Sequence, residues 1–431
     1  MQTLAEGRAE AERCLLSGDR ERALRLSSAL LDSHPDDAET RVIHAAAWMA
    51  GGDWREAVAQ LELCVGSPRV SHLANARLAF CRMKLGDREG ALSAYRAALD
   101  ERPGDFVQRL AYAECLQAGA QDDAAAREFF RTLCNAQAAG AWRNDATTPP
   151  HLRERVRNAM ETVDRGRARL FWQLLDRHVA AYGEAAMRRV REALALYLGA
   201  IEIPAGDTRQ HSKFFHMPGL PPTPYYPRER FPWYPLLESA TGDIRRELDA
   251  VLRSHAPLEP FLGAPGGKVG DEYLGGDPSL RAWDAYFLHR HGKPFEEHLL
   301  RCPATASILS QLPLTIVRDH APEVLFSVLA PDTHIKPHHG VTNTRVVTHL
   351  PLIVPEGDCR LVVGGEAHAW REGRCITFDD TFLHEAWNRS GQLRVVMILD
   401  TWNPDMTPEE RVAVRDLIEG IGDFNAQADG R

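Results

Sequence analysis

The chain has 431 residues, of which 44% are apolar and 26% are charged, and this composition is typical of a globular protein. Its length favours two domains. The formal net charge of −9 argues against nucleic acid as the main partner. No apolar run approaches the ~20 residues that a membrane-spanning helix needs, so we expect no membrane span.

The amino-terminal segment and the cysteines both favour a reducing compartment. The first residues, MQTLAEGRAEAERCLL, are charged and lack the apolar core of a signal peptide. The eight cysteines are spread along the chain and none lies in a CxxC pair. We therefore expect reduced, buried thiols and a cytoplasmic location.

The first third of the chain repeats. The stretches GDRERAL, GDWREAV and GDREGAL begin 34 residues apart, and a weaker fourth copy, AQDDAAA, follows at the same interval. They begin at Gly18, Gly52, Gly86 and Ala120. A period of 34 residues is the signature of a tetratricopeptide array, with the glycine in the turn between two helices. We predict a TPR-like helical solenoid over residues 5–138.

Each repeat also carries a small residue five positions after its first residue, which lets the second helix pack closely on the first. These residues are Ala23, Ala57, Ala91 and Ala125. A solenoid of this kind presents a concave surface that suits an extended peptide. The alternative is a packing or dimerisation module with no ligand of its own.

The middle of the chain predicts a helical bridge over residues 139–203, followed by a change of composition. Eight prolines, with aromatic residues between them, lie between Pro204 and Pro235. Because proline fixes φ and removes a backbone donor, this segment is neither helix nor central strand. Its many aromatic residues predict an ordered strap that packs on the second domain.

The last third contains short β-branched runs separated by Gly, Pro, Asp and Asn, a pattern typical of an antiparallel sandwich or barrel. We predict strands at 324–329, 345–354, 359–363, 375–378 and 393–400. Residues 236–254 and the end of the chain predict helices. The last helix begins with Thr407 as N-cap, Pro408 at N1 and Glu410 at N3, which form a capping box.

A pair of histidines marks a candidate metal site. His338 follows the strand at 324–329 in a predicted loop, and His384 follows the strand at 375–378. Two strand-end histidines can converge at one mouth of a small barrel. Arg394, ten residues after His384, would bind a carboxylate bidentately if it were buried beside them. The set resembles a non-haem Fe(II) site that uses 2-oxoglutarate, although Gly340 stands where a His-x-Asp motif carries its acid.

The neighbouring polar residues are weaker candidates for metal ligands. His334 and His339 fit surface positions, and Glu385 points to the opposite face if its segment is extended. Asp379 and Asp380 are either acceptors behind the histidines or turn formers. Cys359 and Cys375 are expected in the core.

Several motifs together resemble the aspartyl/asparaginyl β-hydroxylase family. They are PHHGVTN, THLPLIVP, FDDTFLHEAWN, RVVMILDTWNP and TPEER, in the family's order. The resemblance implies a double-stranded β-helix (jelly-roll, cupin-like) domain, which we place at residues 204–425, and dependence on Fe(II) and 2-oxoglutarate. The expected fold class is therefore multidomain α + β, a TPR-like solenoid followed by this oxygenase domain. The animal enzyme of the family also carries tetratricopeptide-type helices before its catalytic domain.

The resemblance also implies roles for individual residues. The family binds iron with two histidines, so His338 and His384 are the expected ligands and Gly340 replaces the acid. Ser327 and Arg394 would hold the distal carboxylate of 2-oxoglutarate. His349 would help to bind this cosubstrate, and Trp283 would line the same pocket. No catalytic residue beyond the metal ligands is expected.

The chain departs from the animal enzyme at positions that bear on specificity. The animal enzyme has basic residues where this chain has Val347 and Leu325, and their loss leaves aspartyl specificity open. Arg345 is retained and is the candidate for substrate binding. The animal enzyme's cysteine pair is represented here by Cys302 alone, so that disulfide is not expected.

The expected reaction is O2-dependent hydroxylation of a C–H bond, at the β-carbon of a residue in a peptide or protein, with succinate and CO2 as products. The solenoid would help to present this substrate. One alternative is a hydroxylase of a small substrate, such as a free or carrier-bound amino acid or a lipid acyl chain. Another is a non-catalytic TPR scaffold with a degenerate oxygenase domain.

Overall fold

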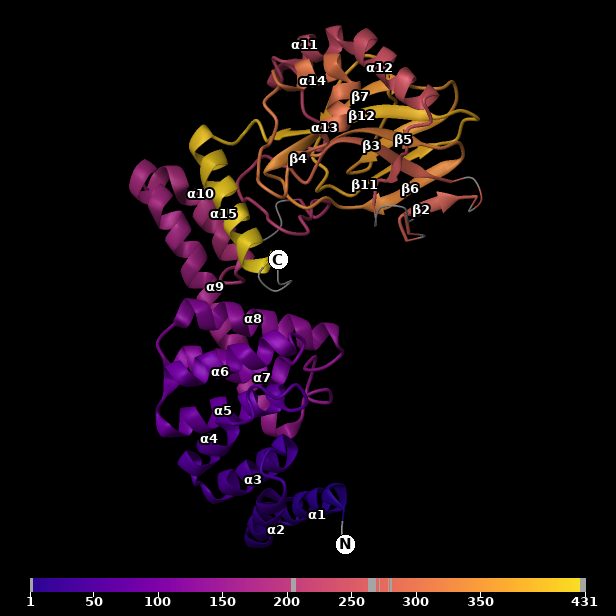
Figure 1. The fold of residues 1–431 in the computed structure, drawn as a ribbon. Coiled ribbons are helices and arrows are strands. Elements are labelled where there is room, and N and C mark those ends of the chain that lie inside the picture. Colours follow the sequence, from indigo (N-terminus) through magenta and orange to yellow (C-terminus); the bar gives the residue numbers. More distant parts are fainter. Residues whose placement is uncertain are drawn as a thin grey trace. The chain divides into compact units, whose positions relative to one another are not determined.

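The computed structural model describes residues 3–202, 207–262, 269–270, 272–277, 279 and 281–426. They form two compact units: the first runs up to Leu170 and takes in the chain from Asp423, and the second is Phe171–Gly422 (Figure 1). We predicted domains at 5–138, 139–203 and 204–425, whereas the compact units divide inside one long helix. No helix in these described ranges is long and apolar enough to cross a membrane.

The first unit is built from helices that pack in consecutive antiparallel pairs. They are α1 (Leu4–Leu16), α2 (Arg20–Ser33), α3 (Ala38–Gly51), α4 (Trp54–Glu62), α5 (Ser71–Leu85), α6 (Arg88–Glu101), α7 (Phe106–Ala118) and α8 (Asp122–Ala138). The predicted TPR-like region is confirmed as helical hairpins. The chain then continues through the short 3-10 helix η1 (Pro150–Leu152) into α9 (Arg153–Tyr182).

The repeat motif sets the geometry of each hairpin. Gly18, Gly52 and Gly86 have φ of 81°, 80° and 79°, a left-handed conformation that favours glycine. Ala120 takes the same kind of conformation in the fourth copy, with φ of 56°. The alanine five positions after each of these residues is fully buried, as close packing of the two helices requires. These alanines are Ala23, Ala57, Ala91 and Ala125.

The second unit takes in the end of α9 and then α10 (Glu184–Tyr197), which begins after Gly183 at φ of 87°. It continues with the 3-10 helix η2 (Arg228–Arg230), α11 (Tyr234–Ser239) and α12 (Thr241–Arg253), and later α13 (Glu296–Arg301) and α14 (Pro303–Leu309). The capping box of α15 (Pro408–Ala426) is present: Thr407 N–H donates to Glu410 at 2.9 Å, and Glu410 N–H donates to Thr407 at 3.3 Å.

Two antiparallel sheets form the β-domain, as predicted. One has the order β1-β3-β5-β12-β7-β10, with β4 paired to β3, and the other has the order β2-β6-β11-β8-β9. The first contains β1 (Glu259–Pro260), β3 (Trp283–Arg290), β4 (Lys293–Pro294), β5 (Val324–Leu329), β7 (Arg345–Ile353), β10 (Ile376–Phe378) and β12 (Arg394–Trp402). The second contains β2 (Leu274–Gly276), β6 (Thr333–His338), β8 (Cys359–Val363), β9 (Glu366–His368) and β11 (His384–Asn388).

Each face of the larger sheet buries its own apolar core. One cluster joins β3, β5, β7 and β12 to helices α11, α12 and α14, which cover this face in Figure 1. The other cluster joins the opposite face to β6, β8 and β11 of the smaller sheet. Because side chains alternate along a strand, residues two apart on β7 and β12 share the face between the sheets.

The predicted strap packs on this domain in the part that the structure describes, from residue 207 onwards. Phe215 and Met217 are fully buried. The backbone N–H groups of His211, Lys213 and Phe215 donate to Thr381, Gly340 and Val341. The strap therefore contacts the chain just after His338 and just before His384. Pro204 lies outside the described residues.

Candidate functional site

His338 and His384 lie opposite each other on neighbouring strands. His338 ends β6, His384 begins β11, and the two are register partners. Their ring centroids are 4.1 Å apart at an interplanar angle of 52°. The sequence predicted His338 in a loop, which is wrong, because a short strand with alternating burial runs through Thr333–His338. The sequence prediction that the two histidines converge agrees with this arrangement.

The backbone sets the tautomer of both imidazoles. His338 Nδ1 lies 2.8 Å from the carbonyl of Lys336, and His384 Nδ1 lies 3.0 Å from the carbonyl of Phe382. A carbonyl oxygen only accepts, so each Nδ1 carries the proton and each Nε2 keeps a lone pair. Such a neutral imidazole with its second nitrogen held is the usual form of a metal ligand.

Burial keeps both rings neutral. It lowers the pKa of His384 to about 4, with His338 as a second cause, and it lowers the pKa of His338 as well. In the described part of the chain, no three His, Cys, Asp or Glu side chains are grouped so that they could hold a metal ion. The two imidazoles could hold a metal as a pair and would leave its other positions to small molecules.

Gly340 has no room for a side chain. A Cβ built at this position would lie 2.2 Å from the carboxyl carbon of Asp380. Asp380 is held there by Arg345, whose guanidinium lies 3.2 Å from its carboxylate. The space next to the backbone of Gly340, where a His-x-Asp motif would carry its acid, is therefore taken by a carboxylate from the loop before His384.

A buried cation without a counter-ion lies elsewhere on the same cavity wall. Arg394 is 1% exposed, and its guanidinium lies 4.7 Å from the ring centre of Trp370. Among the described residues, its Nε and Nη1 atoms have no hydrogen-bond partner. Burial lowers its pKa to about 9. Burying an unpaired charge is costly, so this arrangement favours an anionic ligand.

The other residues expected around this anion lie on adjacent strands. Trp283 Nε1–H donates to the Ser327 hydroxyl at 3.1 Å. Trp370 Nε1–H donates to His349 Nδ1 at 3.3 Å, which leaves His349 Nε2 as a donor. Arg394, Ser327, His349 and Trp283 all line one cavity with the histidine pair.

Arg345 lies at this cavity too, but its charge is compensated. Its guanidinium lies 3.2 Å from Asp380 and 3.1 Å from Asp400. The proximity of these carboxylates raises the pKa of Arg345, whereas burial raises the pKa of Asp400 to about 6. Its assignment to substrate binding stays a prediction, but Arg345 is not a free cation for a substrate anion.

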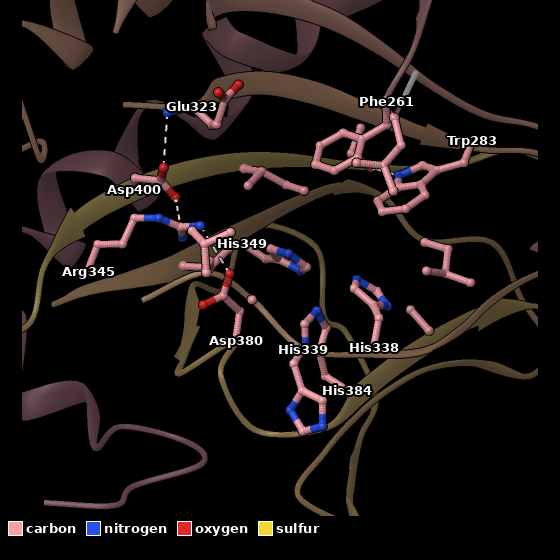
Figure 2. Close-up of a pocket in the computed structure, with 18 of the residues that line it drawn as sticks. Phe261, Trp283, Glu323, His338, His339, Arg345, His349, Asp380, His384 and Asp400 are labelled. Atoms are coloured by element: carbon pink, nitrogen blue, oxygen red, sulfur yellow. Dashed lines mark hydrogen bonds and ion pairs between the residues drawn. The ribbon is translucent and has the colours of Figure 1, made fainter. Parts of the chain in front are cut away.

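The cavity has a volume of about 670 Å³ and is lined by apolar and aromatic side chains together with a comparable number of charged and polar ones. Figure 2 shows Trp283 and Phe261 on one side, Arg345, Asp380 and Asp400 on another, His349 between them, and His338, His339 and His384 lower in the view. The sequence reading missed Phe261, Phe287, Phe378, Glu323 and Asp400. Phe378 and Asp400 lie within quoted motifs, but the five residues are far apart in the chain, so only strand register shows that they share one cavity.

His339, His334 and Asp379, the other polar residues considered near the site, take different positions. His339 was expected at the surface, but it lines the cavity and its Nδ1–H donates to the Thr381 carbonyl at 2.8 Å. His334 instead bonds Glu385 at 2.6 Å. Asp379 accepts from the backbone and hydroxyl of Thr381, which makes it a turn former.

Comparison with known proteins identifies the two parts of the chain. Residues 238–404 match the family model described as Aspartyl/Asparaginyl beta-hydroxylase. Residues 238–404 are an aspartyl/asparaginyl β-hydroxylase domain. Residues 77–105 match a tetratricopeptide repeat model. The hydroxylase domain covers most of the strands and all the residues that we assign to the site.

Similar curated proteins carry the same name. Aspartate beta-hydroxylase domain-containing protein 2 of Xenopus tropicalis is 34% identical over 209 residues, which are 48% of this chain and 54% of the relative. Aspartyl/asparaginyl beta-hydroxylase of Homo sapiens is 26% identical over 333 residues, 76% of this chain and 38% of the relative. The chain thus spans about half or less of the length of these two relatives.

Two solved structures illustrate the distant structural matches. YrrB, titled a TPR protein with an unusual peptide-binding site, is 16% identical with a TM-score of 0.29 and covers 38% of this chain and 85% of its own. A Pseudomonas putida prolyl-4-hydroxylase is 15% identical with a TM-score of 0.24 and covers 38% and 87%. Scores this low carry no argument about this chain.

Proposed function

We propose that the hydroxylase domain is an Fe(II)- and 2-oxoglutarate-dependent dioxygenase that hydroxylates the β-carbon of an amino-acid residue in a peptide or protein. The observation that carries this proposal is the combination of two neutral, facing imidazoles with a buried, unpaired Arg394 in one cavity. A scaffold would gain nothing from an uncompensated buried cation, which costs stability.

The residues fit both groups. His338 and His384 would hold Fe(II) through their Nε2 atoms, since both Nδ1 atoms are committed to carbonyls. Arg394 would pair with the distal carboxylate of 2-oxoglutarate, with Ser327 beside it. When bound with O2, iron and 2-oxoglutarate supply the oxidising power for C–H hydroxylation and yield succinate and CO2.

The chain's own residues would position the reactants and exclude water. Trp370 lies against the Arg394 guanidinium and restricts its orientation. Trp283 stacks on Phe261 at 4.2 Å between ring centroids and holds the Ser327 hydroxyl. His349 is buried and has an Nε2–H available as a donor. No protein side chain needs to act as nucleophile or general acid.

Turnover tests this proposal. The purified chain is incubated with Fe(II), 2-oxoglutarate, O2 and a peptide pool, and succinate and +16 Da products are measured by mass spectrometry. We expect both to require His384, so that His384→Ala abolishes them. His34→Ala is the matched control, because His34 is exposed and does not line the cavity. Equal turnover by both variants would contradict the proposal.

We further propose that the solenoid binds the peptide or protein substrate and that the protein acts in the cytoplasm. The tetratricopeptide match and a groove lined by helices α1, α3 and α5 of the solenoid support the first part. Seven buried cysteines that form no disulfide among the described residues support the second part.

A further inference from the structure

The face of the larger sheet that lines the cavity is charged at both ends of the paired strands β7 and β12 and apolar between them. On β7 the residues that face the cavity are Arg345, Val347 and His349, and on β12 they include Arg394, Ile398 and Asp400. The strands are antiparallel, with Val347 opposite Asp400 and His349 opposite Ile398. One end of this face therefore carries Arg394, and the other carries Arg345 with Asp400.

The part of the face between these two ends is apolar. Val347, Ile398 and Phe287 line the cavity there, and all three are buried. Arg394 is the cation that we assign to the cosubstrate. A substrate side chain that reaches the cavity beside the histidine pair would therefore lie on an apolar floor and point towards Arg345 and Asp400.

In the described part of the chain, that far end offers no uncompensated buried cation. Arg345 is paired with Asp380 and Asp400, so the three groups carry a formal charge of −1. Arg290, which also lines the cavity, pairs with Glu259 at 2.9 Å. Lys213 lines the cavity from the strap but is exposed, so water screens its charge.

The carboxylates at this end differ in how far they are bonded: Asp400 uses both oxygens, whereas Oδ1 of Asp380 is buried and has no hydrogen-bond partner among the described residues. Asp400 accepts from Arg345 and, through its other oxygen, from the Glu323 backbone N–H at 3.0 Å. Glu323 accepts from His291 at 2.8 Å through Nδ1. A substrate amide N–H could donate to Asp380 Oδ1 without the desolvation cost that a cation would meet over the apolar floor.

We propose, on the basis of the function proposed above, that this site accepts an uncharged amino-acid side chain, an amide or an apolar group, and rejects a carboxylate. A carboxylate would be desolvated over Val347 and Ile398 and would meet a negatively charged triad. An uncharged side chain avoids both the desolvation cost and the charge repulsion. An amide can still hydrogen-bond to the end of the face that carries Arg345 and Asp400.

Four peptide pools test the proposal. They share a degenerate background without acidic or basic residues and differ at one position, which holds Asn, Leu, Asp or Lys. We expect the Asn or the Leu pool to be hydroxylated at least about tenfold faster than the Asp pool, as read by +16 Da products. A faster Asp pool, or a faster Lys pool, would overturn the proposal.

An isosteric variant tests the cause. Asp400→Asn removes one of the two charges that compensate Arg345 and keeps an oxygen for the Glu323 N–H. We expect the ratio of Asp to Asn turnover to rise at least about fivefold. Asp358→Asn is the matched control, since Asp358 pairs with Arg389 outside the cavity and should leave the ratio unchanged. An unchanged ratio in folded Asp400→Asn protein would overturn the stated cause.

The failure of this inference and of the proposed function can be told apart. Binding of 2-oxoglutarate to the Fe(II) protein gives a weak visible charge-transfer band. Absence of the band would count against the proposed function. Presence of the band with a preference for Asp or Lys, or with no pool hydroxylated, would count against the uncharged-substrate proposal alone. If Asp400→Asn does not fold, the ranking of the four pools by the wild-type protein still decides.

Discussion

At the scale of single residues, Gly340 is the position where the smallest change has the clearest expected effect. We expect Gly340→Ala to destabilise the apo-protein by about 1–3 kcal/mol, because its Cβ would overlap the Asp380 carboxylate that Arg345 holds in place. Urea unfolding measures this. Gly391→Ala is the control, since no atom lies within 4 Å of a Cβ there. Equal stability of the two variants would show that the space is not filled.

Asp379 gives a prediction about pH. Burial raises its pKa to about 7, so between the unfolded value near 4 and pH 7 the folded protein keeps a proton that the unfolded chain loses. Its contribution to stability is present at low pH and lost as pH rises to 7. The free energy of unfolding of wild type, relative to Asp379→Asn, should fall by about 2–3 kcal/mol between pH 5 and pH 7.5. An unchanged difference would contradict the shift.

At the scale of elements, one buried amide adds two hydrogen bonds to the contacts that hold the strap. Asn343 accepts from the Met217 N–H at 2.8 Å and donates to the Met217 carbonyl at 2.9 Å. Asn343→Ala leaves both backbone groups without these partners and should cost about 2–4 kcal/mol. Hydrogen exchange should speed up in residues 211–217 and near Gly340.

The control for the strap is Asn158→Ala, which removes one half-buried amide contact, to Gln117 at 3.2 Å. We expect a much smaller loss of stability and no change in exchange near the strap. If Asn343→Ala also leaves exchange in residues 211–217 unchanged, the amide does not hold the strap, and its backbone hydrogen bonds and apolar residues suffice.

The elements also show how far the sequence predicts the fold. The strands at 324–329 and 359–363 match β5 and β8, because their apolar residues alternate or are continuous and turn residues bound them. The strands β3, β6 and β11 were missed. β6 contains Lys336 and Pro337, and β11 is HEAWN, so neither has β-branched alternation. Their pairing with neighbouring strands overrides weak local propensity.

The sequence also predicts part of the site and misses part of it. The histidine pair and Arg394 could be predicted because their spacing and residue types carry the chemistry. The compensation of Arg345 could not, since Asp400 reaches it only through the β7–β12 register and Asp380 only through the loop before His384. Likewise, no local signal joins Trp370 to Arg394.

At the scale of the whole molecule, a groove on the solenoid is the expected peptide site. It is lined by α1, α3 and α5 and includes Val42, Ile43 and the half-exposed Leu73. We expect Leu73→Asp to raise KM for a long peptide about threefold to tenfold, through a lost apolar contact, while 2-oxoglutarate binding is unchanged. Leu63→Asp is the control, because Leu63 is 64% exposed and lies outside the groove. Equal effects of the two variants would argue against groove binding.

The most direct test of the central claim is an anaerobic titration of the apo-protein with Fe(II) and then 2-oxoglutarate, followed by the weak visible charge-transfer band. The wild type should develop the band and His384→Ala should not. Arg394→Met should lose it at the same 2-oxoglutarate concentration, yet its apo-form should be no less stable than wild type, because the unpaired cation is gone. No band in folded wild-type protein would contradict a site for iron and 2-oxoglutarate.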